Sequence, residues 1–89
     1  EAYRIGLVQE IVPVGSELTR ALDLAARICE MAPLAVQETK ASSKRWIDEG
    51  FKATVNAMGT VQSKLLASDD AKEGVASFVE RRSAQFKGR

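Results

Sequence analysis

Apolar residues recur at helical spacing in four runs along the chain, and residues that break helices separate these runs. The first run follows Ser16, a good N-cap residue, and its apolar positions share one face of a 3.6-residue helix. They are Leu18, Ala21, Leu22, Ala25, Ile28, Cys29 and Ala32. Pro33 ends this helix and can open a second one, whose weaker apolar stripe reaches the breaker at residues 48–50. The pattern therefore predicts two consecutive helices up to that breaker.

The second half of the chain predicts two more helices. A third starts at Phe51 and keeps an apolar face as far as Leu65, with Gly59 as its one costly interior residue. The fourth starts where Asp70 and Glu73, three positions apart, form a capping-box-like pair. We predict that this last helix bears Ala71, Val75, Phe78 and Val79 and runs to about Arg82. Residues 83–89 are then a tail that a single aromatic side chain, Phe86, would pin.

The start of the chain has a different pattern. Residues 5–13 are rich in β-branched side chains and are closed by Pro13 and Gly15, which suits a short extended segment or strand. A strand would need a pairing partner that no other segment offers. The predicted fold class is therefore all-α, with about four helices after a short N-terminal extended segment. We expect residues 1–89 to form a single helical domain, because the sequence has no internal repeat or low-complexity run.

The composition is that of a folded soluble chain. Of its 89 residues, 45% are hydrophobic and 28% are charged, which is outside the low-hydrophobicity range of disordered proteins. A chain this short buries only about 60% of its unfolded surface. With no disulfide or metal to add stability, we expect it to dock on a partner or to oligomerise.

The charge is nearly balanced overall but uneven along the chain. The formal net charge is +1, so composition gives no reason to expect a nucleic-acid or membrane partner. Residues 72–89 carry five Lys or Arg against two Glu, a net +3, which leaves −2 for residues 1–71. A basic C-terminal helix and tail indicates either a local anion site or a solvated helix end, where cations favour the helix dipole.

Several kinds of chemistry are excluded by residues that are missing. The chain has no histidine and only one cysteine, so we expect no transition-metal site, and an internal disulfide and a Ser-His-Asp or Cys-His catalytic set are excluded. The adjacent carboxylates Asp69 and Asp70 are interpreted as helix caps rather than metal ligands. The apolar runs are far shorter than the roughly 20 residues of a membrane helix. The chain starts with Glu instead of Met, so we expect the natural protein to begin further upstream.

Other conspicuous side chains have ordinary interpretations. Lys40, Lys44 and Arg45 form a basic cluster that is read as a solvated helix face. Trp46 is either a partly buried core residue or an interface anchor. Cys29 lies on the apolar stripe of the first helix and is predicted to be a small buried hydrophobe.

Two stretches at opposite ends of the chain resemble a known family. The N-terminal stretch is AYRIGLVQEIVP (residues 2–13), followed by a Leu/Ala-rich helix and by APLA (residues 32–35) with Lys40. The C-terminal stretch is SDDAKEGVASFVERR (residues 68–82), followed by FKG (residues 86–88). Both stretches, with the helices between them, resemble the C-terminal region of the crotonase (enoyl-CoA hydratase/isomerase) superfamily over the whole chain.

The resemblance implies an enzyme, a lyase that adds water to 2-enoyl-CoA thioesters in fatty acid metabolism. In this family a larger N-terminal spiral domain binds the thioester, two backbone N–H groups hold its oxygen, and two glutamates activate the water. Neither the N–H loops nor the glutamates match any position of this chain, so we expect the spiral domain upstream and assign no catalytic residue here. The hydratase, isomerase, hydrolase and dehalogenase branches are not separated by these residues.

A binding role is what the resemblance carries over to this chain. The family's last helix places a Phe, and a basic residue three positions later, near the adenine and 3′-phosphate of CoA bound in a neighbouring subunit. The matching residues are Phe78 and Arg81, where family members can have Lys at the second position. Residues three apart share a helix face, and an aromatic ring can stack on a purine while a guanidinium binds phosphate. The alternatives are that Phe78 packs with its neighbours Val75 and Val79 and that Arg81 is a solvated helix end.

The family also implies how the protein assembles. We expect a homo-trimer or a dimer of trimers in the cytoplasm, with acyl-CoA as substrate, no required cofactor, and no nucleic-acid or membrane partner. The helices would form the assembly domain, and Phe78 and Arg81 would help to close the CoA pocket. The alternative function is a stand-alone helical oligomerisation or partner-binding module without catalytic activity. A DNA-binding domain is disfavoured because the basic residues are scattered.

Overall fold

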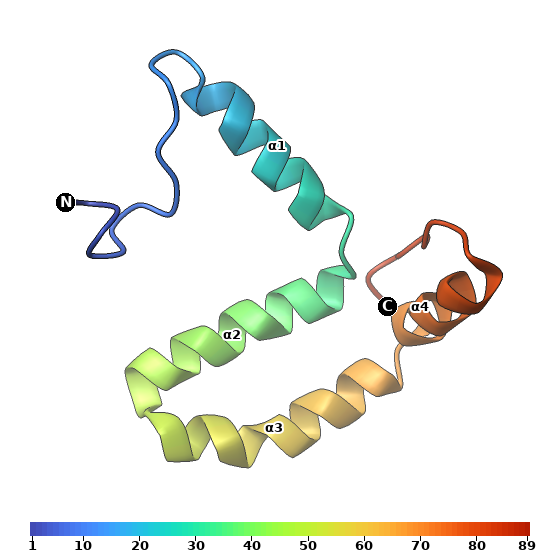
Figure 1. Ribbon diagram of the computed structural model, residues 1–89. Coiled ribbons are helices and arrows are strands. Elements are labelled where there is room, and N and C mark those ends of the chain that lie inside the picture. Colours follow the sequence, from blue (N-terminus) through green and yellow to red (C-terminus); the bar gives the residue numbers. More distant parts are fainter.

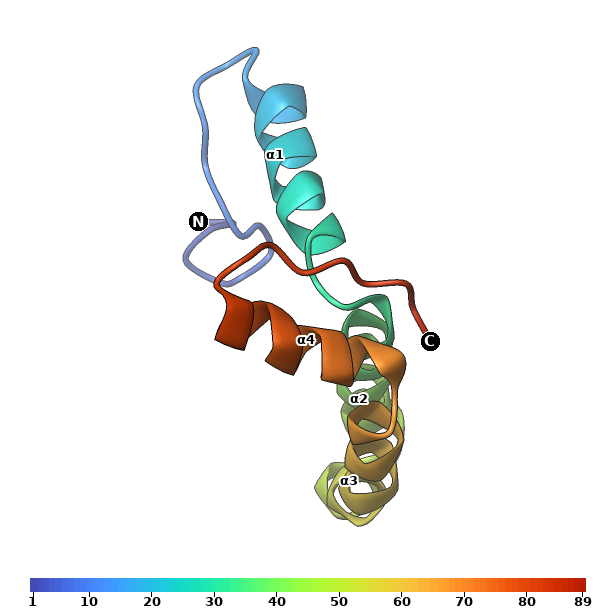
Figure 2. The ribbon, with the colours of Figure 1, turned by 90° about the vertical axis from the view of Figure 1, so that its right-hand side faces the viewer.

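The computed structural model describes residues 1–89 as four helices and no strand, which confirms the all-α prediction. The helices are α1 (Glu17–Cys29), α2 (Pro33–Glu49), α3 (Phe51–Leu66) and α4 (Asp69–Glu80). Figure 1 shows α2 and α3 side by side as a hairpin, with α1 and α4 both leaving from its open end. In Figure 2, α1 and α4 diverge from each other, so the four helices do not close into a bundle.

The chain is much more open than an independent domain of its size. Its radius of gyration is 16.6 Å and its principal extents are 43 × 38 × 17 Å. A compact domain of 89 residues has a radius of gyration of about 12 Å. Apart from the contacts of α2 with α3 and of α3 with α4, the apolar faces of the helices are consequently little covered by one another.

No hydrophobic side chain of this chain is buried. The only two buried residues are polar, Asp70 and Ser77, and both belong to α4. Leu18, Leu22 and Ile28, the predicted inner face of α1, are all exposed. Hydrophobic burial is the main driving force of folding, so these faces need another surface to cover them.

The α2–α3 hairpin turns at Gly50, which has a φ of 87° and a ψ of 178°. Glycine alone adopts this backbone region readily, so the sequence fixes the turn at this position. The carbonyl of Gly50 accepts hydrogen bonds from the backbone N–H and the hydroxyl of Thr54. Near the open end of the hairpin, Lys64 of α3 forms an ion pair with Glu38 of α2 at 2.6 Å.

The predicted extended segment at the start of the chain consists of turns, bends and residues without regular secondary structure, and it forms no strand. Its N-terminal turn closes through backbone hydrogen bonds, such as that from the N–H of Leu7 to the carbonyl of Ala2 at 2.9 Å. Further along, Glu10 forms an ion pair with Arg20 of α1. With no neighbouring strand, local bonds satisfy this backbone instead of a β-ladder.

Several predicted details are wrong. The first helix ends at Cys29, before the predicted Ala32. The fourth helix is capped by Ser68, whose hydroxyl accepts a hydrogen bond from the N–H of Ala71, and not by Asp70. That helix ends at Glu80 instead of Arg82, because Arg81 adopts a left-handed backbone conformation.

Two predicted core residues are exposed within this chain. Cys29 lies on the open face of α1 and is exposed, contrary to the prediction of a buried thiol. Trp46 is 53% exposed and makes an edge contact with the ring of Phe51, with 5.2 Å between ring centroids. Both residues face solvent for the same reason, because no other helix packs over them.

Candidate functional site

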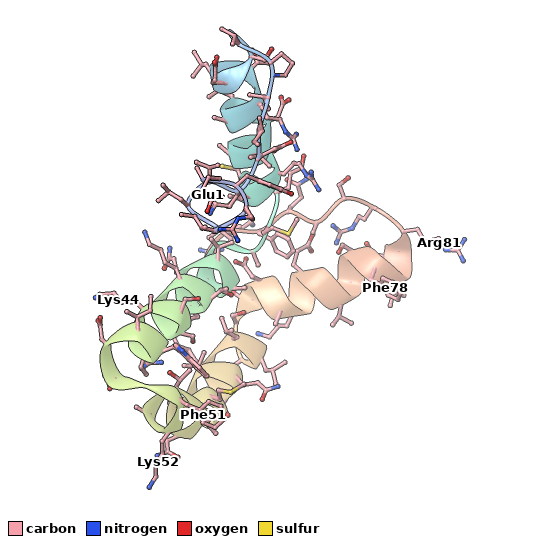
Figure 3. The ribbon with its side chains drawn as sticks, turned by 60° about the vertical axis from the view of Figure 1, so that its left-hand side comes forward. Glu1, Lys44, Phe51, Lys52, Phe78 and Arg81 are labelled. Carbon is pink, nitrogen blue, oxygen red and sulfur yellow. The ribbon has the colours of Figure 1, made fainter.

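Phe78 and Arg81 both lie at the C-terminal end of α4. Figure 3 shows their side chains projecting outward from this end of the chain. Phe78 is 84% exposed, and the Arg81 side chain takes part in no hydrogen bond or ion pair of the structure. The end of α4 therefore carries an exposed aromatic ring and, three positions later, a guanidinium with free donors.

The alternative interpretation of Phe78 as a core residue is not satisfied within this chain. Val75 and Val79, its expected packing partners, are 67% and 73% exposed. The three side chains instead form an open apolar strip on α4. This strip is available to a ligand or to another protein surface.

Arg81 does not continue the helix as the sequence predicted. Its φ is 54°, and it is the one residue other than glycine with a positive φ in the chain. The N–H of Arg81 donates to the carbonyl of Phe78 at 3.3 Å, and the N–H of Arg82 donates to the carbonyl of Ser77 at 3.1 Å. These two bonds form a Schellman helix end, in which glycine normally occupies the position of Arg81. The expected common helix face for Phe78 and Arg81 is thus replaced by a turn that begins at Arg81.

Arg82, next in the chain, is held by two carboxylates. Its guanidinium donates two hydrogen bonds to the Glu73 carboxylate, the one from Nη2 at 2.8 Å, and its Nε donates to Glu80. Glu73 also accepts the backbone N–H of Gln85 at 2.7 Å. The hydrogen bonds from Arg82 and then from Gln85 lower the pKa of Glu73 from 4.5 to about 2, and the same pair raises the pKa of Arg82.

Residues 82–89, which we call the C-terminal strap, run back along α4. Figure 2 shows this segment returning above α4 from its far end towards its start. The carboxylate of Asp70 accepts hydrogen bonds from the backbone N–H groups of Lys87 and Gly88. The backbone N–H of Asp70 donates to the carbonyl of Arg89. Phe86, predicted to pin the tail, lies beside Gly74 and is only half-buried. Carboxylates, more than the aromatic ring, therefore hold the strap.

The role of Asp70 and Glu73 was missed in the sequence. Their spacing resembles that of a capping box, so the pattern assigned them to the start of α4. Both side chains instead reach residues of the strap that are nine to eighteen positions away. The spacing of Asp70 and Glu73 does not indicate their bonds to the strap, because the path of the strap depends on the tertiary structure.

The basic cluster on α2 is only partly a solvated face. Lys44 is exposed and forms an ion pair with Asp48 one turn later. Arg45 is half-buried, and its Nη1 atom is buried without a hydrogen-bond partner. Lys40 borders an open apolar groove lined by Ile28, Met31, Ala35, Val36 and Thr39.

Two structural absences bear on the type of site. No three His, Cys, Asp or Glu side chains come together in a way that could hold a metal ion. None of the four helices is both long enough and apolar enough to cross a membrane.

The chain was compared with known protein families, sequences and structures. The family model described as Enoyl-CoA hydratase/isomerase matches residues 1–89. Among similar sequences, enoyl-CoA hydratase EchA19 of Mycobacterium tuberculosis is 39% identical over 93 residues, which cover 100% of this chain and 34% of that protein. Carnitinyl-CoA dehydratase of Proteus mirabilis is 37% identical over 93 residues, which cover 100% of this chain and 36% of that protein.

Solved structures give the same result. A "probable enoyl-CoA hydratase/isomerase" from Mycobacterium abscessus matches with a TM-score of 0.95 and 41% identity, over 99% of this chain and 34% of that one. An enoyl-CoA hydratase from Mycobacterium tuberculosis matches with a TM-score of 0.90 and 31% identity, over 99% and 35% of the two chains. The chain thus spans about a third of the length of these relatives.

Proposed function

The chain belongs to the enoyl-CoA hydratase/isomerase family, and on this premise we propose that it is the C-terminal assembly part of an enoyl-CoA hydratase that also closes the CoA pocket. The reaction is the addition of water to a 2-enoyl-CoA thioester, as part of cytoplasmic fatty acid metabolism. The catalytic glutamates and the N–H groups that hold the thioester oxygen belong to an upstream spiral domain. No metal or redox cofactor takes part in this chemistry.

The observation that carries the assembly role is the absence of any buried apolar side chain. Four amphipathic helices with uncovered faces gain little from folding alone, because the hydrophobic contribution comes only when apolar area leaves water. In the proposal, the spiral domain and neighbouring subunits of a trimer cover these faces. The 16.6 Å radius of gyration fits a layer that wraps around other parts better than it fits an independent domain.

The pocket-closing role rests on the C-terminal end of α4. Phe78 offers an open ring on which the adenine of CoA stacks, and the unpaired guanidinium of Arg81 binds the 3′-phosphate. A guanidinium binds phosphate more strongly than a neutral donor does, because its hydrogen bonds are charge-assisted and can be bidentate. In the assembled enzyme these contacts reach CoA bound in the adjacent subunit.

The test uses the full-length enzyme with Phe78→Ala and Arg81→Ala. Both contacts lie far from the reacting bond, so they stabilise the bound substrate and the transition state equally. We expect each substitution to raise the KM for acyl-CoA about tenfold, which corresponds to about 1.4 kcal/mol, with kcat unchanged. Lys72→Ala is the control, because Lys72 is exposed on α4 and pairs only with Asp69. An unchanged KM in both variants would sink the pocket-closing role.

A stand-alone oligomerisation module is the second candidate, because the same uncovered helix faces suit a partner protein. The intact mass and N-terminal sequence of the protein from its source cell separate the two. A product about three times longer than this chain supports the enzyme. A natural product of 9.7 kDa favours the oligomerisation module.

A further inference from the structure

We propose that Glu73 is a positioning residue for Arg81: by holding Arg82 and the strap, it fixes the left-handed turn that directs the Arg81 side chain out of the chain. The inference rests on the proposed function, in which Arg81 binds the phosphate of CoA. Glu73 does not touch the substrate. It acts on the backbone conformation of the residue that does.

The backbone of Arg81 is the unusual feature that needs an explanation. Its φ of 54° lies in the left-handed region, where the Cβ of any residue other than glycine crowds the following carbonyl. The other four residues with positive φ in the chain are all glycines, namely Gly6, Gly15, Gly50 and Gly88. A non-glycine residue keeps such a conformation only where its surroundings hold it there, and such residues are common at ligand sites.

Glu73, eight positions earlier in α4, contributes to this restraint through Arg82. Residue 80 is fixed by the last turn of α4. Residue 82 is fixed by its backbone bond to Ser77, by its bond to Glu80 and by the paired hydrogen bonds between its guanidinium and the Glu73 carboxylate. The same carboxylate accepts the N–H of Gln85, which directs the strap back over α4. Arg81 is the one residue between these two anchors, so its dihedral angles are determined by them.

Because the carboxylates near the turn pair with Arg82, the Arg81 side chain remains free to bind a ligand. Arg81 and Arg82 are adjacent in the chain, and of these two residues Glu73 and Glu80 bond only to Arg82. The Arg82 side chain is held by these carboxylates, whereas the Arg81 side chain is unpaired and projects outward (Figure 3). If the turn relaxed to a helical conformation, the position of the Arg81 guanidinium would shift along with the strap.

The direction of the expected effect distinguishes positioning from simple charge. Removing the negative charge of Glu73 from a phosphate site favours anion binding by Coulomb's law, so a charge effect alone would lower the KM. Loss of the restraint on Arg81 has the opposite sign and raises it. A raised KM after Glu73→Gln therefore reports a lost position.

The experiment compares Glu73→Gln, Arg81→Ala and the double variant in the full-length enzyme. Each is assayed with a 2-enoyl-CoA and with the matching 3′-dephospho-CoA thioester. We expect Glu73→Gln to raise the KM for the CoA thioester at least threefold, with kcat unchanged and no rise for the dephospho substrate. In the Arg81→Ala background, Glu73→Gln should add no further increase. Asp69→Asn should not raise the KM, because it removes a charge one turn earlier in α4 and, although Asp69 pairs with the side chain of Arg89, it leaves the bonds from Glu73 to Arg82 and Gln85 intact.

Three results overturn the inference while leaving the role of Arg81 intact: an unchanged KM in Glu73→Gln, an equal rise with the dephospho substrate, or additive effects in the double variant. If Arg81→Ala itself leaves the KM unchanged, both the phosphate contact and its positioning are overturned. Should Glu73→Gln fail to assemble, Glu73→Asp keeps the charge but shortens the reach to Arg82, and the same pattern is expected of it.

Discussion

The carboxylate of Asp70, in the first turn of α4, accepts the backbone N–H of Gly88 at 2.8 Å across 18 positions of the chain. Asp70 is the most buried residue of the protein, with 3% of its surface exposed. A charged group is buried at such a site only when hydrogen bonds replace its water, and the strap provides them. This contact brings the end of the chain back to the first residue of α2, where Gly88 lies against Pro33.

Asp70→Asn should loosen the strap without unfolding the rest of the chain. The amide side chain loses the charge of a carboxylate that accepts two backbone N–H groups, and bonds to a charged group contribute about 1.5–3 kcal/mol. In the full-length enzyme we expect hydrogen exchange at the amides of Lys87 and Gly88 to become about tenfold faster or more. Amides in the middle of α3 serve as the internal reference. Equal exchange at Gly88 in both proteins would contradict this role of Asp70.

Two glycines of the α2–α3 hairpin should respond differently when each is replaced by alanine, because Gly50 forms the turn and Gly59 lies inside α3. Gly50→Ala should lower the stability of the full-length enzyme by about 1–3 kcal/mol, because a φ of 87° with a ψ of 178° is open essentially to glycine alone. Gly59→Ala should leave it unchanged or raise it by about 0.5–1 kcal/mol, because Gly59 lies inside α3 with no atom within 4 Å of its added Cβ. Thermal unfolding of both variants checks the pair. Similar midpoints for the two would be inconsistent with the turn described.

The ion pair between Glu73 and Arg82 predicts a pH dependence. The pKa of Glu73 is lowered from 4.5 to about 2, so the folded state favours the ionised form. The resulting stabilisation is complete above pH 4.5 and is lost as the pH falls from 4.5 through about 2. We expect an NMR titration of the Glu73 carboxyl carbon to show a midpoint near 2, and Arg82→Gln to move it upward. A midpoint near 4.5 in the unchanged protein would refute the pairing in solution.

Residues 1–89 expressed by themselves should not behave as a cooperative domain. With no buried apolar side chain, they lack the hydrophobic core on which an all-or-none transition depends. At a concentration where sedimentation shows a monomer, we expect helical far-ultraviolet dichroism, binding of the dye ANS, and a broad thermal transition. A sharp two-state transition without dye binding would mean that the helices close on themselves in solution.

Helix positions were predictable because they depend on local signals. Pro33 opens α2, Gly50 separates it from α3, and α4 starts at Asp69, directly after Ser68, close to where the sequence indicated. Finer features were not predictable when they involved distant residues. Ser68 and not Asp70 caps α4, since the Asp70 carboxylate is used by the strap.

The candidate site divides in the same way. The sequence by itself determined four amphipathic helices and the family, because apolar periodicity, helix breakers and motif spacing are local features that can be recognised in the sequence alone. It also indicated Phe78 and Arg81, through their place in the C-terminal motif. Only the tertiary structure decided that Arg81 leaves the helix in a left-handed turn and that Glu73 holds the next residue, since bonds between distant positions depend on the path of the strap. It likewise decided that the apolar faces of the helices stay open, because an amphipathic pattern says which side of a helix seeks burial but not which surface will provide it.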